Sequence, residues 1–324
     1  MKNILVIGGT YFLGKCFLET LLREGICSEE AADEEIMVYV LNRGSVPMER
    51  PKSGKPIRLQ SLRADRHDGK AMAAVVAEHL AEKTLDAVVD FCGYSEGDIC
   101  SLFDCIYRAD ASISQYLFVS TVDVYRRGTG KDITEEAPYE NRDFGGDAGA
   151  YILGKVALEA ELKSCCANYG SVWTILRPAV IYGPGNYAPR EGIYFHWIRQ
   201  AGQIIHPTDA TGFFQLVYVG DAAEAIRLCL QNPIAYNKAY NICRNTTLTY
   251  EDFANILTKA TQVAFDRVEI TVQEATEQGI PLPFPLSMEE SEHYIGDRAK
   301  ELGISFTDVI SGMEMTYRSF CEAH

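Results

Sequence analysis

The segment Ile4–Gly14 reads ILVIGGTYFLG, and it decides the fold. Its first four apolar residues predict a buried strand, and the residues that follow its glycines keep an apolar stripe at helical spacing. Glycines between a strand and a helix let the backbone approach a pyrophosphate closely, while free N–H groups at the helix start face the anion. We therefore predict a dinucleotide-binding turn, with a simple tight loop as the alternative. The predicted cofactor contacts in this turn are Gly8, Thr10, Tyr11, Phe12, Leu13 and Gly14.

Short apolar runs alternate with helical patterns along the first half of the chain, which is typical of a parallel sheet with helices on both faces. The predicted fold class is α/β: a Rossmann-like, doubly wound parallel sheet with a smaller, discontinuous C-terminal substrate lobe. The predicted strands are Ile4–Ile7, Ile36–Leu41, Ile57–Leu62, Ala87–Cys92, Gln115–Ser120, Val172–Leu176 and Phe214–Val219.

Two domains are expected from this pattern. Residues 1–178 plus about 214–243 would form the dinucleotide-binding domain, and about 179–213 plus 244–324 the substrate-binding lobe. Ser28–Glu35 carries five acids in eight residues and predicts a solvated surface insertion. Gly279–Ser287 has three alternating prolines and predicts an extended loop rather than a central strand.

The composition excludes several classes of protein. The 324 residues carry a formal charge of -15, so phosphate backbones would repel the chain unless it had a concentrated basic face, and none is visible in the sequence. No apolar run approaches the roughly 18 residues needed to span a bilayer. Ten scattered cysteines without a C-x-x-C pair predict neither a metal site nor a disulfide framework, and indicate a reducing cytoplasm. We predict a cytoplasmic protein with no nucleic-acid or membrane partner.

The ends of the second and third predicted strands bear on the choice of cofactor. An acid after the second strand would bind the ribose hydroxyls of NAD, whereas a cation favours the 2′-phosphate of NADP. Asn42 and Arg43 stand there and favour NADP(H) over NAD(H), unless Arg43 points to solvent. Asp65, after the third strand, either reaches the adenine amino group or caps the helix that follows.

A tyrosine and a lysine four residues apart form the candidate catalytic pair. Tyr151 and Lys155 share one face of a predicted helix, and a nearby cation lowers a phenol pKa from about 10 toward neutrality. Thr121 ends a predicted strand thirty residues earlier, where such folds bind ligands. A hydroxyl with a Tyr/Lys pair is suited to moving a proton while a nicotinamide moves a hydride.

These residues belong to a set of ordered motifs that resembles a known family. The sequence is similar to extended short-chain dehydrogenases/reductases of the NAD-dependent epimerase/dehydratase type. The matching motifs are GGTYFLG, STVDVY, YILGK, LRPAVIYGPGN (Leu176–Asn186), LVYVGDAAEAI (Leu216–Ile226) and AYNIC (Ala239–Cys243).

The resemblance implies roles for the candidate residues. It makes Tyr151 the catalytic acid/base, Lys155 the residue that orients the nicotinamide ribose and lowers the tyrosine pKa, and Thr121 a hydrogen-bonding partner of the reacting oxygen. It also implies that Pro178 lies near the nicotinamide, that Val180–Gly185 begins the substrate lobe, and that the chain forms a homodimer.

Three departures from the family pattern concern the ligand sites. Tyr11 replaces the middle glycine of the turn, as in an atypical GGTxFLG branch that resembles uncharacterised bacterial epimerase-like proteins and plastid stem-loop RNA-binding proteins. Gln215 stands where sugar-nucleotide epimerases typically place an Arg for the substrate diphosphate. Cys92 and Tyr94 lie in a segment that is usually a small, Ala-rich turn beside the cofactor, so Tyr94 either narrows the pocket or covers the sheet end.

Asp123 lies two residues before Tyr125, the register at which the family's sugar-nucleotide dehydratases carry an acid that removes a proton. It is either such a catalytic acid or a loop and capping residue.

Residues of the predicted lobe supply a candidate substrate contact set. Tyr187, Arg190 and His196, with Gln215 and Tyr94, could grip a polar, anionic small molecule by hydrogen bonding and stacking. The predicted function is an NAD(P)-dependent oxidoreductase, epimerase or dehydratase that acts on a sugar-like alcohol or carbonyl, including nucleotide sugars. The alternative is a non-catalytic NAD(P)-binding sensor or RNA-associated protein that keeps the fold.

Overall fold

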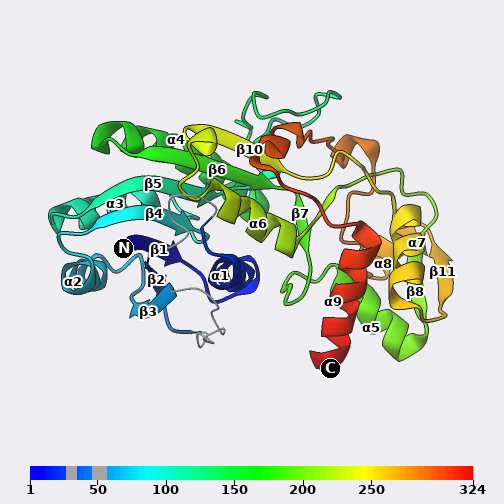
Figure 1. Cartoon of the computed structure of the whole chain (residues 1–324). Helices are drawn as coiled ribbons and strands as arrows, with labels where there is room; N and C mark the ends of the chain where they lie inside the picture. The colour runs from blue at the N-terminus through cyan, green and yellow to red at the C-terminus, as the bar shows by residue number, and fades with distance from the viewer. Residues whose placement is uncertain (27–34, 46–56, 324) are drawn as a thin grey trace.

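The computed structural model describes residues 1–26, 35–45 and 57–323 (Figure 1). The predicted acidic insertion Ser28–Glu35 lies outside these residues, except for Glu35. Within the described ranges, no helix is long and apolar enough to cross a membrane.

Seven parallel strands form the central sheet, in the order β10-β6-β5-β4-β1-β2-β3. They are β1 (Lys2–Ile7), β2 (Ile36–Asn42), β3 (Ile57–Arg63), β4 (Thr84–Asp90), β5 (Ser112–Val119), β6 (Val172–Pro178) and β10 (Lys238–Ile242). The order reverses between β1 and β4, and the connections that follow these two strands run to opposite faces of the sheet, which leaves a crevice at their carboxyl ends. The sheet confirms the predicted Rossmann-like α/β fold.

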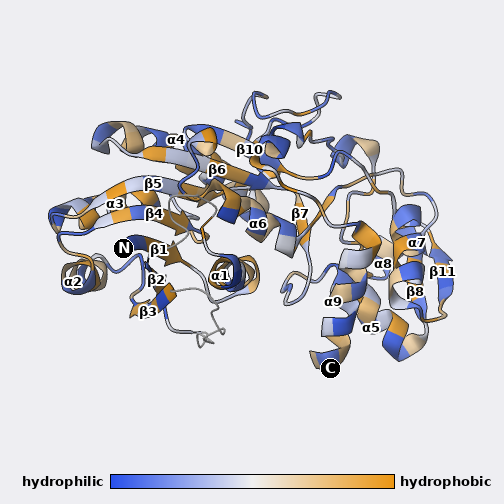
Figure 2. Ribbon diagram, viewed as in Figure 1, coloured by the Kyte–Doolittle hydropathy of each residue, from blue (hydrophilic) through white to orange (hydrophobic). Residues whose placement is uncertain are grey.

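Helices cover both faces of the sheet. α1 (Phe12–Glu24) and α6 (Val219–Cys229) pack together with one face, through Phe17, Leu21 and Ile226. The other face is covered by α2 (Gly69–His79), α3 (Asp98–Arg108) and α4 (Gly146–Tyr169). The covered strands read as apolar runs, which Figure 2 shows as hydrophobic colouring along β1.

A smaller lobe lies beside the sheet, at the right of Figure 1. Its core packs aromatic rings such as Tyr194, Phe253 and Phe284 against one another. Its elements are α5 (Glu191–Ala201), β8 (Gln203–Pro207), α7 (Tyr250–Thr261), β11 (Asp266–Ile270), α8 (Val272–Glu277) and α9 (Val309–Ala323). β8 and β11 form a separate parallel pair.

The strand predicted at Phe214–Val219 differs from the structure. Only β9 (Leu216–Tyr218) is extended, it pairs with β7 (Val180–Tyr182) outside the central sheet, and α6 begins at Val219. The apolar run spans a strand and the first buried turn of a helix, which periodicity does not separate. The loop predicted at Gly279–Ser287 is confirmed: it contains no helix or strand.

Candidate active site

A cavity of about 970 Å³ opens where the carboxyl ends of the sheet strands face the smaller lobe. The sheet side contributes the turn after β1 and the ends of β2, β4 and β5, and α4 contributes its first turns. The lobe side contributes three segments: residues 186–190, 213–215 and 285–294. We call these the sheet wall and the lobe wall.

The glycine-rich turn forms the start of the sheet wall, and all six of its predicted contact residues line the cavity. A Cβ at Gly14 would lie 2.3 Å from the carbonyl oxygen of Gly8, so only glycine allows the helix to start this close to the strand. Gly8 has φ +89°, and a Cβ there would lie 2.1 Å from the Cys92 Sγ atom. The turn is therefore packed tightly enough for its backbone to face a ligand directly.

The ends of β2 and β3 form the next part of the wall. The Asn42 Oδ1 atom accepts a hydrogen bond from the Gly44 N–H at 2.7 Å, which fixes the turn that carries Arg43. Arg63 Nε donates to the Arg43 carbonyl oxygen at 3.3 Å, so two arginines lie at this rim. Asp65 Oδ1 accepts from the His67 N–H at 3.0 Å, a local loop interaction that leaves its other oxygen for a ligand. Asn42, Arg43 and Asp65 all line the cavity.

A buried ion network supports the turn after β4, and the sequence did not reveal it. The Asp90 carboxylate is fully buried and accepts hydrogen bonds from Arg66, from the Tyr116 hydroxyl at 2.7 Å and from the Cys92 N–H at 2.8 Å. Buried carboxylates are retained when such partners compensate their charge. The network thus holds Cys92, a predicted cofactor contact, in the cavity wall.

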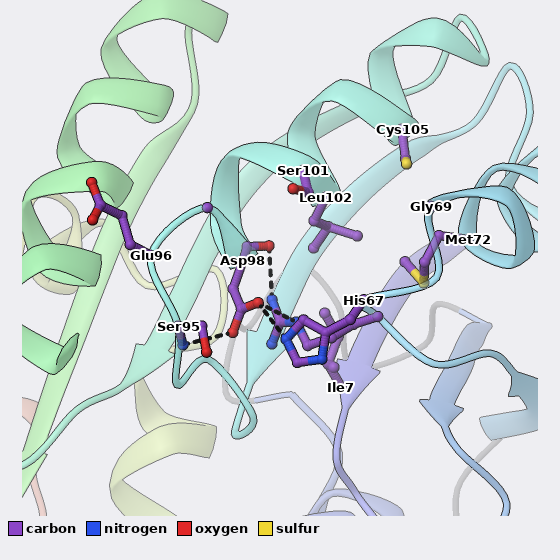
Figure 3. Close-up of a pocket in the computed structure, with 12 residues that line it drawn as sticks. Ile7, His67, Gly69, Met72, Ser95, Glu96, Asp98, Ser101, Leu102 and Cys105 are labelled. Carbon is purple, nitrogen blue, oxygen red and sulfur yellow. Dashed lines mark hydrogen bonds and ion pairs between the residues drawn. The ribbon is translucent and has the colours of Figure 1, made fainter. Parts of the chain in front are cut away.

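Asp98, at the start of α3, extends this network (Figure 3). Its carboxylate accepts from the N–H groups of Tyr94 and Ser95 at 2.9 and 3.0 Å, and lies 2.9 Å from His67 Nε2. Burial acts against ionisation, but these N–H groups and the Arg66 guanidinium hold the pKa of Asp98 below its usual value. A smaller pocket of about 230 Å³ adjoins here and shares Arg66 and His67 with the large cavity.

The structure brings Thr121, Tyr151 and Lys155 to the same cavity. Lys155 is 2% exposed; its Nζ donates to the Val119 carbonyl oxygen at 2.9 Å and lies 5.9 Å from the centroid of the Tyr151 ring. Burial lowers the pKa of Lys155 to about 8. Tyr94 covers the same ammonium, with its ring centroid 4.9 Å away. The ammonium is thus charged at neutral pH and enclosed by aromatic rings.

The expected lowering of the Tyr151 pKa is wrong for this structure. Tyr151 is 39% exposed, but the protein groups around its hydroxyl remove water from it, and this desolvation, and next the nearby Asp123, raise the pKa of Tyr151 to about 12. Thr121 and Arg190 act in the opposite direction but do not offset these effects. The phenol is therefore neutral and carries its proton at pH 7.

Asp123 lies within the short 3-10 turn Val122–Val124, which Thr121 caps. Its carboxylate accepts a hydrogen bond from the Thr121 hydroxyl at 3.0 Å and forms an ion pair with Arg127, while its own N–H donates to Thr121 Oγ1. In the described part of the chain, Ser120 Oγ and Arg127 Nε are buried without a hydrogen-bond partner. Both residues line the cavity, so they have unused capacity for a ligand.

The lobe wall differs from the expectation in two residues. Gln215 lines the cavity, but its amide donates to the carbonyl oxygens of Arg244 and Tyr294 and accepts from the Tyr294 N–H. His196 does not line the cavity: it is exposed on α5, with its ring centroid 4.8 Å from that of Phe320 on α9. His196 lies two positions from the buried Tyr194, which on a helix places it on the opposite side.

The remaining predicted residues, Pro178, Tyr187 and Arg190, line the cavity. The sequence analysis missed other lining residues. Ser120 adjoins the predicted Thr121, and Arg127 lies four residues after Asp123, a spacing at which opposite charges can pair. The sequence around both residues could therefore have pointed to them. Arg66 adjoins the predicted Asp65 in the same way, whereas Glu290, Glu292 and Tyr294 lie in a segment without a predicted site residue. Within the described ranges, no cluster of His, Cys, Asp and Glu could hold a metal ion.

Comparisons with solved structures agree with this architecture. UDP-glucose 4-epimerase from Thermotoga maritima, solved with UDP-glucose, is 19% identical with a TM-score of 0.74 and covers 99% of both chains. UDP-glucose 4-epimerase from Thermus thermophilus in complex with NAD is 20% identical with a TM-score of 0.71, covering 99% of this chain and 100% of the other. The dTDP-glucose 4,6-dehydratase from Bacillus anthracis in complex with NAD is 16% identical with a TM-score of 0.71, covering 99% and 97%. At these identities, the likeness establishes the fold.

Sequence comparisons assign the family. A chloroplast stem-loop binding protein of 41 kDa from Arabidopsis thaliana is 27% identical over 267 residues, which span 80% of this chain and 63% of the plant protein. The family model described as NAD dependent epimerase/dehydratase matches residues 4–243, well over half of the chain. The chain therefore belongs to the NAD-dependent epimerase/dehydratase family, an enzyme family of the extended short-chain dehydrogenase/reductase type.

Proposed function

We propose that this chain binds NADP(H) in preference to NAD(H) and interconverts a sugar-like alcohol and carbonyl, with Tyr151 as the acid/base. The observation that carries the proposal is that Thr121, Tyr151 and Lys155 share one cavity with the glycine-rich turn. It supports the proposal because a candidate proton donor and a backbone turn suited to a pyrophosphate line the same cavity.

The residues present fit a dinucleotide. The tightly packed turn at Gly8 and Gly14 offers backbone N–H groups to a pyrophosphate, and the unpartnered Ser120 hydroxyl offers a further donor. Arg43 would hold the 2′-phosphate of NADP, with Arg63 at the same rim adding positive charge. Lys155 would bind the nicotinamide ribose. When bound, the nicotinamide would supply hydride transfer.

Proton transfer follows from the pKa values of the site. Tyr151, with a pKa of about 12, holds its proton at pH 7 and can donate it to a developing alkoxide, while the charged Lys155 stabilises the phenolate left behind. While the Thr121 hydroxyl donates to Asp123, the Thr121 oxygen is left to accept a hydrogen bond from a ligand. Thr121 thus suits a substrate hydroxyl, and Tyr151 suits a carbonyl.

Asp123 serves this proposal as a positioning residue. Its carboxylate accepts a hydrogen bond from Thr121 and forms an ion pair with Arg127. Both interactions stabilise the bound carboxylate and make it less available as a base. The structural support for a role in elimination or epimerisation is therefore weaker than that for orienting Thr121.

The substrate would bind against the lobe wall. The Thermotoga epimerase was solved with UDP-glucose, which makes nucleotide sugars the first compounds to test. The Gln215 amide is used by the backbone, so a diphosphate would depend on Arg190 and Arg127 for charge neutralisation. We propose residues 179–213 and 244–324 as the lobe that sets this specificity.

Calorimetric titration with NADP(H) and NAD(H), followed by turnover assays on a panel of nucleotide sugars and free sugars, tests the proposal. The Tyr151→Phe variant should keep cofactor affinity and lose turnover, because only the transferable proton is removed. Tyr107→Phe is a matched control, since Tyr107 donates to the Tyr169 carbonyl oxygen away from the cavity. No binding of either dinucleotide, or unchanged turnover in Tyr151→Phe, would refute it.

A second candidate function comes from the plant relative, whose name describes stem-loop binding. The charge of -15 opposes binding to a phosphate backbone. A filter-binding assay against a stem-loop RNA at several salt concentrations decides this point: tight, salt-sensitive binding would favour the RNA-associated function.

A further inference from the structure

Two tyrosines from opposite walls of the cavity stack on each other. The Tyr11 and Tyr187 ring centroids lie 5.2 Å apart with an interplanar angle of 29°. Phe12 adds an edge-to-face contact to Tyr187, with centroids 6.0 Å apart at 88°. All three residues line the cavity. The pair therefore joins the glycine-rich turn of the sheet wall to the lobe wall.

Each ring is carried by a segment that is fixed independently of the stack. Tyr11 directly precedes α1, in the turn that the Gly8–Gly14 contact packs tightly. Tyr187 follows Asn186, whose Nδ2 donates to the buried Glu191 carboxylate at 2.9 Å and whose Oδ1 accepts from the Ala188 N–H at 3.0 Å. The two backbones are thus held, and the side chains can rotate apart without unfolding either segment.

Both rings are largely exposed to solvent. Tyr11 is 52% exposed and Tyr187 is 64% exposed, so both could be truncated with little loss of packing. Burial raises the pKa values of Tyr94 and Tyr151, and the Tyr187 hydroxyl adds to both shifts. Tyr187, on the lobe wall, therefore lies between Tyr11 of the glycine-rich turn and the candidate proton donor Tyr151.

We propose that Tyr11 and Tyr187 form an aromatic clasp that must part before a dinucleotide can enter or leave the cavity. The clasp rests on the proposed function, because a pyrophosphate held by the turn Gly8–Gly14 would lie beside Tyr11. It gives a role to the side chain that replaces the middle glycine of the turn. A cofactor that exchanges slowly suits a reaction without net oxidation or reduction, such as epimerisation or dehydration, since the cofactor ends each turnover in its starting oxidation state.

Stopped-flow measurement of NADPH association and dissociation tests the clasp. Binding is followed by NADPH fluorescence, and dissociation by displacement with excess NADP⁺. An aromatic pair contributes a factor of about two to ten, so Tyr187→Ala should raise both rate constants by about that factor and leave Kd nearly unchanged, and Tyr11→Ala should raise the association rate constant by the same factor. A gate slows entry and exit equally, whereas a simple contact with the cofactor would alter the dissociation rate alone.

Three further variants sharpen the test. The double variant Tyr11→Ala/Tyr187→Ala should bind NADPH no faster than either single variant, because one clasp is lost in all three. Tyr187→Phe keeps the ring and should exchange like the unmodified protein. Phe144→Ala removes an exposed ring outside the cavity and should also leave both rates unchanged.

The outcomes separate the clasp from the proposed function. Unchanged rates in Tyr11→Ala and Tyr187→Ala, a faster dissociation with unchanged association, or additive effects in the double variant would each overturn the clasp while leaving dinucleotide binding intact. Absence of any NADPH binding to the unmodified protein would overturn both.

Discussion

The two walls of the cavity are held in place by different kinds of interaction. On the sheet wall, the lining residues come directly after parallel strands of the central sheet. The Asp90–Arg66 ion pair beneath them is almost completely buried. On the lobe wall, Gln215 bonds to backbone groups that lie 29 and 79 residues further along the chain. The sheet wall is thus part of the framework around the central sheet, whereas the lobe wall is held by the aromatic core of the smaller lobe, through Phe214 and Phe284, and by polar bonds such as those of Gln215. Substitutions should therefore separate stability and cofactor binding from substrate recognition.

The largest effect is expected from Asp90→Asn on the sheet side. It removes the charge that compensates the buried Arg66 guanidinium, and breaking a buried ion pair costs about 3–5 kcal/mol in the free energy of unfolding. Urea denaturation measures the loss. Asp86→Asn, on the same strand, is the control: its pairing with Lys2 at 3.4 Å is partly exposed and should cost less than about 1 kcal/mol. Equal losses would contradict the sealed network.

A smaller effect is expected from Gln215→Leu on the lobe side. Leucine fills a similar volume but leaves the Tyr294 N–H and two carbonyl groups without their partner, which costs about 1–3 kcal/mol. Dinucleotide affinity should be unchanged, because the sheet wall is untouched. The exposed Gln273→Leu is the control and should change stability by less than about 0.5 kcal/mol. A parallel loss of dinucleotide affinity would mean that the two walls are not independent.

The most gradual effect, and the smallest for a change of one pH unit, is a pH dependence from Lys155, which lies between the walls. Below about pH 8 the lysine is protonated in both the folded and the unfolded chain, so its burial penalty is constant. Between about pH 8 and the ordinary value of 10.5 the unfolded chain binds more protons, so stability rises with pH by at most about 1.4 kcal/mol per pH unit.

Lys155→Met removes this dependence. The difference in unfolding free energy between the two proteins should favour the variant most below pH 8 and shrink as the pH rises toward 10.5. A constant difference across that range would show that the pKa of Lys155 is not lowered.

Much of the fold could be predicted because parallel strands and a glycine-rich turn leave local patterns. The strands from Ile4–Ile7 to Val172–Leu176 lie within three residues of their predicted ends. The seventh strand of the sheet was not predicted. It is Lys238–Ile242, whereas the apolar run at Phe214–Val219, which was predicted as a strand, contributes only the short β9 outside the sheet. A run of apolar residues records burial, and burial alone does not say which sheet a strand joins.

The sheet wall was also predictable, since residues at the carboxyl ends of neighbouring parallel strands meet at one edge. The lobe wall was not. Glu290, Glu292 and Tyr294 reach the cavity from a segment more than a hundred residues beyond Tyr151, and no periodicity links them. The low pKa predicted for Tyr151 assumed that Lys155 dominates, whereas burial and the nearby Asp123 raise this pKa.

A crystal structure of the protein grown with NADP⁺ tests the central claim most directly. The account predicts a dinucleotide with its pyrophosphate on Gly8–Gly14, its 2′-phosphate beside Arg43 and its nicotinamide ribose hydrogen-bonded to Lys155, next to the Tyr151 hydroxyl. A dinucleotide bound outside this cavity, or with its nicotinamide away from Tyr151 and Lys155, would contradict it.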